Sequence, residues 1–162
     1  MGEDFVTRGV KGSEKGVKGS ERTIALVAEE GASLSSGSLR LYYLLPSPSG
    51  EGSGVRPVGC IDLYNYDPLN RRAAVGIMVA SDHRRQGHAL AMLRALETLY
   101  STQTIKQSSN QTIHTLYADI AATNAASLAL FAKAGYTECG HFRDWLLVGD
   151  RYIDSIRMQL IL

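Results

Sequence analysis

RAAVGIMVASDHRRQGHA, residues 72–89, contains the change of character that decides the fold. Its first nine residues, Arg72 to Ala80, are nearly all apolar and have the length of a strand, a pattern typical of a strand buried on both faces. The residues that follow are polar, and from Gly87 to Tyr100 apolar residues recur at helical spacing. We therefore predict a strand, a short turn and a helix in direct succession.

The junction between this strand and this helix is a candidate anion site. The first backbone N–H groups of a helix have no partner within the helix, and the helix dipole favours negative charge beside them. Gly87 would let a diphosphate approach the backbone, while Arg84 and Arg85 add positive charge at the rim. A plainer interpretation is that Gly87 only begins the helix and that water surrounds both arginines. Spacing alone does not decide, because the turn contains neither the G-x-G-x-x-G fingerprint nor a P-loop.

Two segments, in this order, resemble the signatures of the GNAT N-acetyltransferases. The first is similar to Val-x-x-x-x-[Arg/Gln]-x-x-Gly-x-[Gly/Ala], a pattern matched here by Val79, Arg84, Gly87 and Ala89. The second, NAASLALFAKAGY at 124–136, resembles Asn-x-x-[Ala/Ser]-x-x-Leu-[Tyr/Phe]-x-x-x-Gly-[Phe/Tyr]. The resemblance covers roughly residues 57–162. The C-terminal part looks most like the branch that holds spermidine acetyltransferases and ribosomal-protein N-terminal alanine acetyltransferases.

The resemblance implies a GNAT-like (acyl-CoA N-acyltransferase) fold of the α/β class, with acetyl-CoA as co-substrate. The backbone of Ile77, Met78 and Val79 would pair with the pantetheine arm and polarise the thioester carbonyl. The pyrophosphate of CoA would contact Arg84, Arg85, Gln86, Gly87, His88 and Ala89. Asn124, Ser127 and Phe131 would lie along the other side of the pantetheine, with Asn124 also a candidate catalytic residue. Acetyl would pass directly to a primary amine of a polyamine, another small amine or a protein N-terminus.

The chain departs from the family where the reaction needs proton transfers. Many members have a tyrosine as general acid for the thiolate at the position of Phe131, which has no proton to donate. The acid is therefore unassigned, although a CoA thiolate is a fair leaving group near neutral pH. Weak candidates for the base, each also compatible with a structural role, are Asp62, Tyr64, His114, Tyr117, Asp119 and Asp144. The alternative function is a non-catalytic acyl-CoA-binding regulatory domain.

The remaining elements follow from periodicity and turn residues. We predict strands at 23–28, 39–45, 58–66, 113–121, 142–148 and 152–160, and a second helix at 124–134 that Asn124 caps and Gly135 ends. Strands 72–80 and 113–121 should form a parallel pair in a mixed, mostly antiparallel twisted sheet with helices on both faces. Strand 152–160 is expected at an edge, which a homodimer would cover.

The N-terminal part predicts little ordered structure. VKGSE occurs at 10–14 and again at 17–21, in a segment with too few apolar residues to offset the entropy of ordering, so 1–22 should be disordered. Residues 23–162 should form a single domain. GNAT members usually have helices before the first hairpin, whereas this chain has a Ser/Gly-rich stretch at 31–38. We therefore expect an incomplete or unusual acceptor side.

Composition argues against several partner classes. The chain has 17 Lys+Arg against 16 Asp+Glu and no basic block, which disfavours nucleic acid and membrane surfaces as partners. No run approaches the roughly 20 apolar residues of a membrane helix, and the first residues lack the apolar core of a signal peptide, so a cytoplasmic location is expected. Neither the two cysteines nor the four histidines have metal-ligand spacing, so no metal is expected. The sequence does not identify the acceptor amine.

Overall fold

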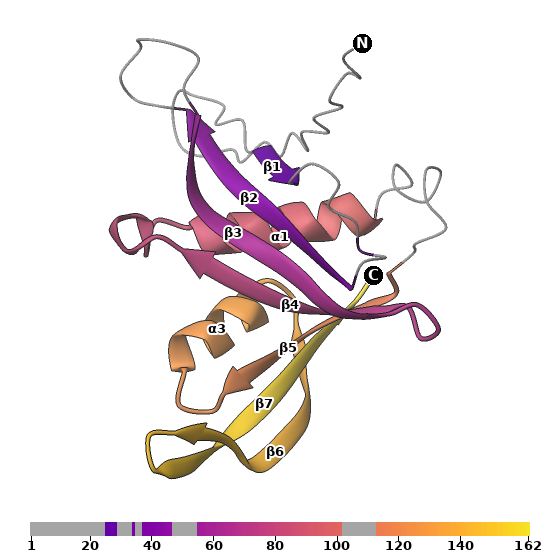
Figure 1. Ribbon diagram of the computed structural model, residues 1–162, viewed down its shortest axis with the longest axis vertical. Helices are drawn as coiled ribbons and strands as arrows, with labels where there is room; N and C mark the ends of the chain where they lie inside the picture. Colours follow the sequence, from indigo (N-terminus) through magenta and orange to yellow (C-terminus); the bar gives the residue numbers. More distant parts are fainter. Residues whose placement is uncertain (1–24, 29–33, 35–36, 47–54, 102–112) are drawn as a thin grey trace.

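The computed structural model describes residues 25–28, 34, 37–46, 55–101 and 113–162 (Figure 1). Its strands are β1 (Ala25–Ala28), β2 (Ser38–Pro46), β3 (Val55–Asp67), β4 (Arg72–Val79), β5 (Thr115–Ala121), β6 (Thr137–Val148) and β7 (Arg151–Ile161). A 3-10 turn, η2 (Ser81–His83), precedes helix α1 (His88–Ser101), and helix α3 (Ala125–Lys133) follows β5. The predicted order of strands and helices is confirmed. The disorder expected for 1–22 concerns residues outside the described ranges.

The strands form one seven-stranded sheet in the order β1-β2-β3-β4-β5-β7-β6. Among the described neighbours, β4 and β5 are the parallel pair, as predicted, and the other neighbours are antiparallel. The prediction that strand 152–160 lies at an edge is wrong, because β7 inserts between β5 and β6. Ile156 and Met158 of β7 are buried opposite β5, whereas most of β6 is exposed, so β6 is the edge strand at this end of the sheet.

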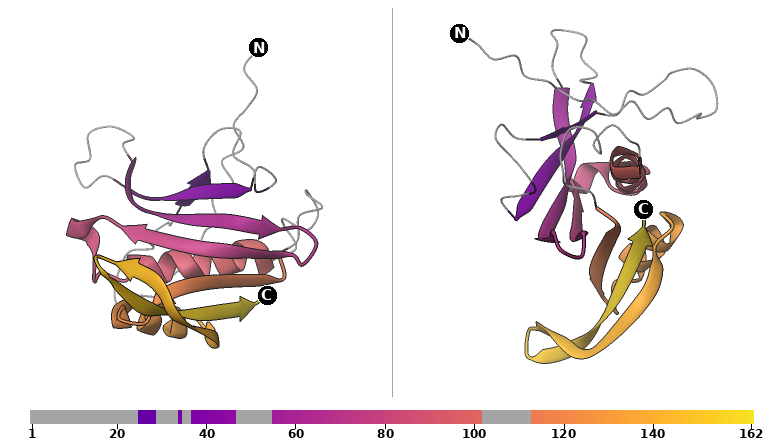
Figure 2. Two further views of the ribbon diagram at one scale, coloured as in Figure 1. Left: turned by 60° about the horizontal axis from the view of Figure 1, so that its bottom comes forward. Right: turned by 90° about the vertical axis from the view of Figure 1, so that its right-hand side faces the viewer.

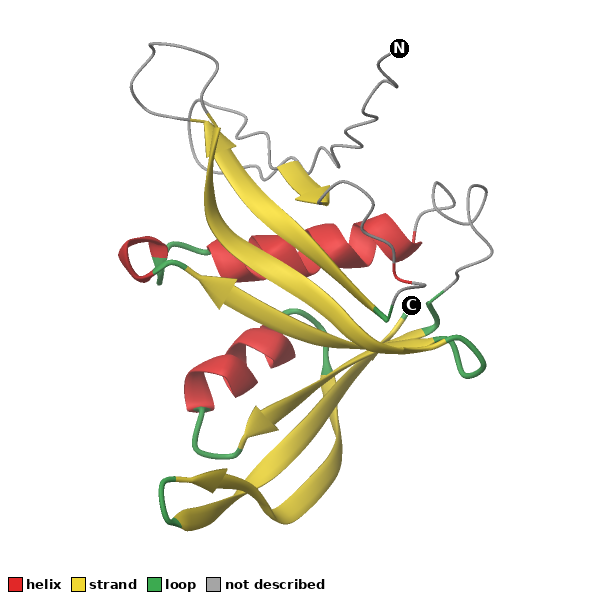
Figure 3. Cartoon of the chain, in the orientation of Figure 1, coloured by secondary structure: helices red, strands yellow, loops and turns green. Residues whose placement is uncertain are grey.

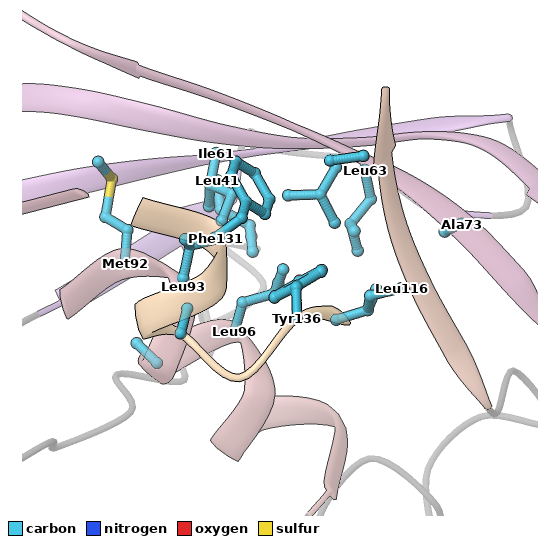
Figure 4. Close-up of a cluster of buried hydrophobic side chains, with 14 of the residues drawn as sticks. Leu41, Ile61, Leu63, Ala73, Met92, Leu93, Leu96, Leu116, Phe131 and Tyr136 are labelled. Atoms are coloured by element: carbon cyan, nitrogen blue, oxygen red, sulfur yellow. The ribbon is translucent and has the colours of Figure 1, made fainter. Parts of the chain in front are cut away.

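One hydrophobic core lies between the sheet and both helices (Figure 4). The sheet contributes Leu41, Ile61 and Leu63, α1 contributes Met92, Leu93 and Leu96, and α3 contributes Phe131. Helices α1 and α3 contact each other and lie on the same side of the strands (Figure 2, right). The expectation of helices on both faces is therefore not met in the described part of the chain. The burial of both apolar helix faces against one curved sheet explains this arrangement.

The ends of α3 follow the predicted local chemistry. The Asn124 side chain caps the helix, with its Oδ1 accepting the backbone N–H of Ser127 at 3.1 Å. Gly135 follows the helix with a φ of 92°, a conformation that glycine adopts without a Cβ clash. Both boundary predictions are confirmed. No helix in the described ranges is both long and apolar enough to span a membrane.

Candidate functional site

The environment of β4 changes halfway along the strand. Its first residues, Arg72 to Ala74, pair with β5, and Ala73 to Val75 are buried. From Gly76 to Val79 the strand remains paired with β3, but the described pairing with β5 has ended. Figure 1 shows β4 and β5 starting side by side and separating toward their C-terminal ends. The prediction of burial on both faces therefore holds for the first half only, and Met78 is 60% exposed.

This separation has a direct chemical consequence. Every second backbone N–H and C=O group of an extended strand points away from its paired neighbour. Along Ile77, Met78 and Val79 these groups have no strand partner in the described part of the chain. An extended ligand can therefore add to this side of β4 by main-chain hydrogen bonds.

The turn that follows β4 connects this strand to α1 (Figure 3), and two of its side chains bind backbone carbonyl oxygens. Arg84 donates from Nε to the Val79 carbonyl oxygen at 3.1 Å, and Gln86 donates from Nε2 to the Asp82 carbonyl oxygen at 3.0 Å. Gly87 has a φ of 87°, and a Cβ there would meet no atom within 4 Å. The glycine is thus required for its backbone conformation, with open space in front of it.

The turn presents positive charge at the start of α1. Arg84, Arg85, Gln86 and Gly87 are all exposed. Within the described ranges neither arginine forms an ion pair with a carboxylate. The N-terminal end of α1 adds partial positive charge, so the turn favours an anion. The structure therefore brings together the residues predicted for the pyrophosphate, apart from one.

That exception is His88, whose side chain lies in the core. It is 5% exposed, its Nδ1 lies 3.5 Å from the Tyr43 hydroxyl, and its ring is edge-on to that of His83. The next residue, Ala89, is partly buried. His88 is the first residue of α1 and its side chain is buried, which the polar character of histidine did not indicate in the sequence. A contact of the His88 side chain with a ligand at the exposed turn is therefore not supported.

The second predicted segment is divided between surface and core. Asn124 is exposed and Ser127 partly buried at the start of α3, joined by the capping hydrogen bond. Phe131 is 3% exposed, and its ring packs edge-to-face on Tyr136 with centroids 4.9 Å apart. Phe131 is thus a core residue in this structure, in agreement with its lack of an ionisable group.

The face of the sheet away from the helices carries polar and aromatic side chains beside the separation of β4 and β5. Side chains alternate along a strand, so Asp62 and Tyr64 of β3 share this face with Tyr117 and Asp119 of β5. Burial raises the pKa of the Tyr64 phenol, and the charges of Asp119 and other neighbours add to the effect. The structure therefore gathers four of the six candidate bases on one face.

The other two candidate bases lie elsewhere. The Nδ1 of His114 is 2.9 Å from Thr115 Oγ1 at the beginning of β5. Asp144 lies in an irregular part of β6, where its backbone N–H donates to Asp154 Oδ1 at 2.9 Å. Neither residue adjoins the end of the β4–β5 pairing.

Two arginines that the sequence analysis overlooked control the charge of this face. Arg157 donates from Nε and Nη2 to the two carboxylate oxygens of Asp119, both at 2.7 Å, and Arg40 chelates Asp62 at 2.7 and 2.9 Å. The Arg157 guanidinium also lies 4.7 Å from the centroid of the Tyr117 ring. The alternation of polar and apolar residues along the strands that carry these arginines and aspartates was the signal in the sequence that could have placed them on one face. Both aspartates are therefore poor bases, because each carboxylate is already engaged in a two-point ion pair.

Comparison with known protein families gives this arrangement a context. Residues 22–137 match the family of the acetyltransferase (GNAT) domain. The chain belongs to this family.

Individual relatives agree with the GNAT assignment. The chain is 27% identical over 105 residues to a spermidine N(1)-acetyltransferase of Vibrio cholerae, a match that covers 64% of this chain and 56% of the relative. It therefore spans little more than half the length of that relative. A solved spermidine N-acetyltransferase of Vibrio cholerae, in complex with CoA and spermine, has a TM-score of 0.63 and 21% identity over 78% of this chain and 67% of its own.

A dodecameric structure of the spermidine N-acetyltransferase of Vibrio cholerae has a TM-score of 0.62 and 22% identity, over 77% of this chain and 65% of its own. At this level of identity the likeness establishes the GNAT fold. In this GNAT domain each of the two sequence signatures follows one of the two separating strands. The first follows β4 into α1 and the second follows β5 into α3. Among the described residues, no group of three or more His, Cys, Asp or Glu side chains is arranged to hold a metal ion.

Proposed function

We propose that this GNAT domain transfers acetyl from acetyl-CoA to a primary amine. The observation that carries the proposal is the unpaired edge of β4 from Ile77 to Val79, which leads directly into the exposed turn at Arg84 to Gly87. An extended chain that ends in a diphosphate matches both features, because the strand edge offers main-chain partners and the turn offers cationic ones. The residues of this structure therefore fit an acyl-CoA.

Each part of the site has a distinct task in this reaction. Acetyl-CoA supplies a thioester, whose carbonyl carbon the amine attacks without a covalent enzyme intermediate. The unpaired N–H groups at Ile77 to Val79 would orient the pantetheine and stabilise the oxyanion that develops on the carbonyl. Arg84, Arg85 and Gln86 would hold the pyrophosphate, with the Arg84–Val79 hydrogen bond fixing the turn relative to the strand. Asn124 and Ser127, at the start of α3, would lie along the other side of the pantetheine.

The finer proposal for the acceptor is a polyamine. Its support is the similarity to spermidine acetyltransferases, one of which was solved with CoA and spermine. The described sheet face beside the β4–β5 separation bears two carboxylates, each paired with an arginine. A second ammonium group of a polyamine would have to compete with these arginines for the carboxylates. A small amine without a second charge and a protein N-terminus should therefore be assayed as acceptors beside the polyamines.

A non-catalytic acyl-CoA-binding domain is the second candidate. It is favoured by the burial of Phe131 at the position where many family members have a tyrosine that acts as the general acid. Both candidates require acetyl-CoA binding, and only the transferase requires turnover. Thiol release in the presence of spermidine and other primary amines therefore separates them.

The experiment that tests the shared site is calorimetric titration with acetyl-CoA of the wild type and of Gly87→Trp. We expect binding in the micromolar range that weakens by more than about tenfold, or about 1.4 kcal/mol, in the variant. Gly149→Trp is a matched control, because Gly149 also has a positive φ and open space around a Cβ but lies in the β6–β7 turn. Equal loss of affinity in both variants, or no binding by the wild type, would contradict the proposal.

We also infer a single catalytic unit over residues 23–162 that forms a homo-oligomer. Support for oligomerisation comes from the edge strand β6 and from exposed apolar side chains at the β6–β7 hairpin, Trp145, Leu147, Val148 and Tyr152. A related spermidine N-acetyltransferase is dodecameric. Light scattering coupled to size exclusion, on the wild type and on Trp145→Glu, tests this inference. A wild type that stays monomeric at high concentration would overturn it.

A further inference from the structure

The proposed reaction leaves one proton transfer without a residue. When the C–S bond of the thioester breaks, the sulfur takes the bonding electron pair and needs a proton to leave as the neutral thiol. The Phe131 side chain has no ionisable proton, and it is buried in the core. A hydroxyl group of a different residue, near the end of the β4–β5 pairing, could donate this proton.

Tyr64 lies at this point of the fold. It pairs across the strands with Ala74, the last residue of β4 that also pairs with β5. A Cβ built on the next glycine, Gly76, would lie 3.4 Å from Tyr64 Cε1. The ring therefore extends over β4 where the two strands begin to separate, and the side chain is 37% exposed.

The other hydroxyls near the site are less suitable. The ring of Tyr117 is held beneath the Arg157 guanidinium. Tyr136, which packs on Phe131, is 3% exposed and lies among core residues such as Leu96 and Leu116 (Figure 4). Tyr117 is also partly exposed, but Tyr64 is 37% exposed, and in the described part of the chain the Tyr64 hydroxyl has no hydrogen-bond partner to displace.

The charged surroundings of Tyr64 favour the protonated phenol. The groups that face it are Asp62 on its own strand, Tyr117 and Asp119 on β5, and Arg157 on β7. Burial is the largest cause that raises the pKa of Tyr64, and the two aspartates and Tyr117 act in the same direction against Arg157. A phenol is protonated at neutral pH even at its ordinary pKa of about 10, and the raised pKa of Tyr64 leaves it in this proton-donating form.

We propose that Tyr64 is the general acid that protonates the CoA sulfur. This inference rests on the proposed transferase function. The amine nitrogen attacks the carbonyl carbon, the C–N bond forms and the C–S bond breaks, and the phenol proton moves to the sulfur. The nitrogen, positively charged after attack, gives a proton back to the phenolate directly or through water. The products are the amide and the free thiol, and Tyr64 returns to its starting state.

The test compares the wild type with Tyr64→Phe, using acetyl-CoA and hydroxylamine as the acceptor. Hydroxylamine is already neutral at neutral pH and is small, so the reaction depends little on acceptor deprotonation or recognition. We expect kcat to fall by about 100-fold or more, a typical contribution of a general acid. The KM for hydroxylamine and the calorimetric Kd for acetyl-CoA should each stay within about threefold. Tyr152→Phe, which removes a hydroxyl from an exposed ring in the hairpin, is the matched control.

Each outcome has a defined meaning. A kcat of Tyr64→Phe within about threefold of the wild type would overturn the acid role. A fall in kcat/KM that arises from a higher KM would also overturn it, and would make Tyr64 an acceptor-binding residue. A wild type that does not bind acetyl-CoA, or binds it without acetylating hydroxylamine or spermidine, contradicts the transferase proposal itself. That failure is seen without any variant, so the two proposals fail distinguishably.

Discussion

The two halves of β4 have similar sequences and different surroundings. Arg72 to Val75 and Gly76 to Val79 are both dominated by small and apolar residues. The first half lies between two strands with Ala73 to Val75 buried, whereas the second half has β3 on one side and no described strand on the other. The first half holds the fold together and the second half offers its backbone to a ligand. The apolar character of a segment thus indicates that the strand borders a core, but it does not indicate whether the strand has one or two neighbouring strands.

The largest expected effect is a loss of folding stability when a side chain packed behind the first half of β4 is shortened. Leu63 is 0% exposed and pairs with Val75, so Leu63→Ala should leave a cavity behind the first half of β4. We expect a loss of about 2–5 kcal/mol in the free energy of unfolding. Met78→Ala, in the 60% exposed position of the second half, should change it by less than about 0.5 kcal/mol. Urea denaturation measures both, and similar losses in the two variants would erase the distinction between the halves.

A smaller effect is expected from two glycines, Gly59 of β3, which pairs with Val79, and Gly76, the first residue of the second half. A Cβ at Gly59 would lie 2.5 Å from the Met78 carbonyl oxygen and 3.0 Å from Met92 Cε, so β3, β4 or α1 must shift. Gly59→Ala should therefore cost about 1–3 kcal/mol of stability. At Gly76 the nearest atom, Tyr64 Cε1, is 3.4 Å away in a side chain that can move.

For Gly76→Ala we expect a stability change under about 1 kcal/mol, because the slight crowding is offset by the lower entropy of the unfolded chain. The thermal or urea unfolding curves of Gly59→Ala and Gly76→Ala should therefore have clearly different midpoints. If Gly76→Ala were the more damaging variant, the second half of β4 would be packed more tightly than its partner strand, contrary to the structure.

Local chemistry explains which parts of the fold the sequence predicts. Asn124 and Gly135 mark the ends of α3, and the spacing of apolar residues marks α1, because these signals act within a few residues. The strand order depends on contacts between distant segments. Strand 152–160 was expected at an edge, but it pairs with β5, which is distant in the sequence, and its Ile156 and Met158 are buried there.

The candidate site divides in the same way. The turn at Arg84 to Gly87 was predictable, since it is a contiguous segment with its own backbone requirements. The burial of His88 was not, because the residues that enclose its ring, Tyr43 and His83, come partly from a distant strand. The same is true of the pairing between Arg157 and Asp119, which are 38 residues apart and meet only when β7 inserts beside β5.

The smallest expected effect concerns the turn that starts the first half of β4. Asp67 Oδ1 accepts the backbone N–H of Asn70 at 3.0 Å, Oδ2 accepts Asn70 Nδ2 at 2.7 Å, and Arg72 Nη2 lies 3.1 Å from Oδ2. The backbone N–H of Asn70, followed by its side chain and by Arg72, lowers the pKa of Asp67 below its ordinary value. The carboxylate is therefore bound more favourably in the folded chain than in the unfolded one.

A lowered pKa in the folded state sets the sign of the pH dependence. The stabilisation is fully present above the ordinary aspartate pKa of about 3.9 and is lost as the pH falls through the lower folded value. Asp67→Asn should therefore be less stable than the wild type at pH 7, and the difference should shrink below about pH 4. Asn70→Ala, which removes one donor, should reduce the same difference. Urea titrations from pH 7 to pH 2.5 measure it, and a difference that grows toward acid would contradict the role of Asp67 in anchoring β4.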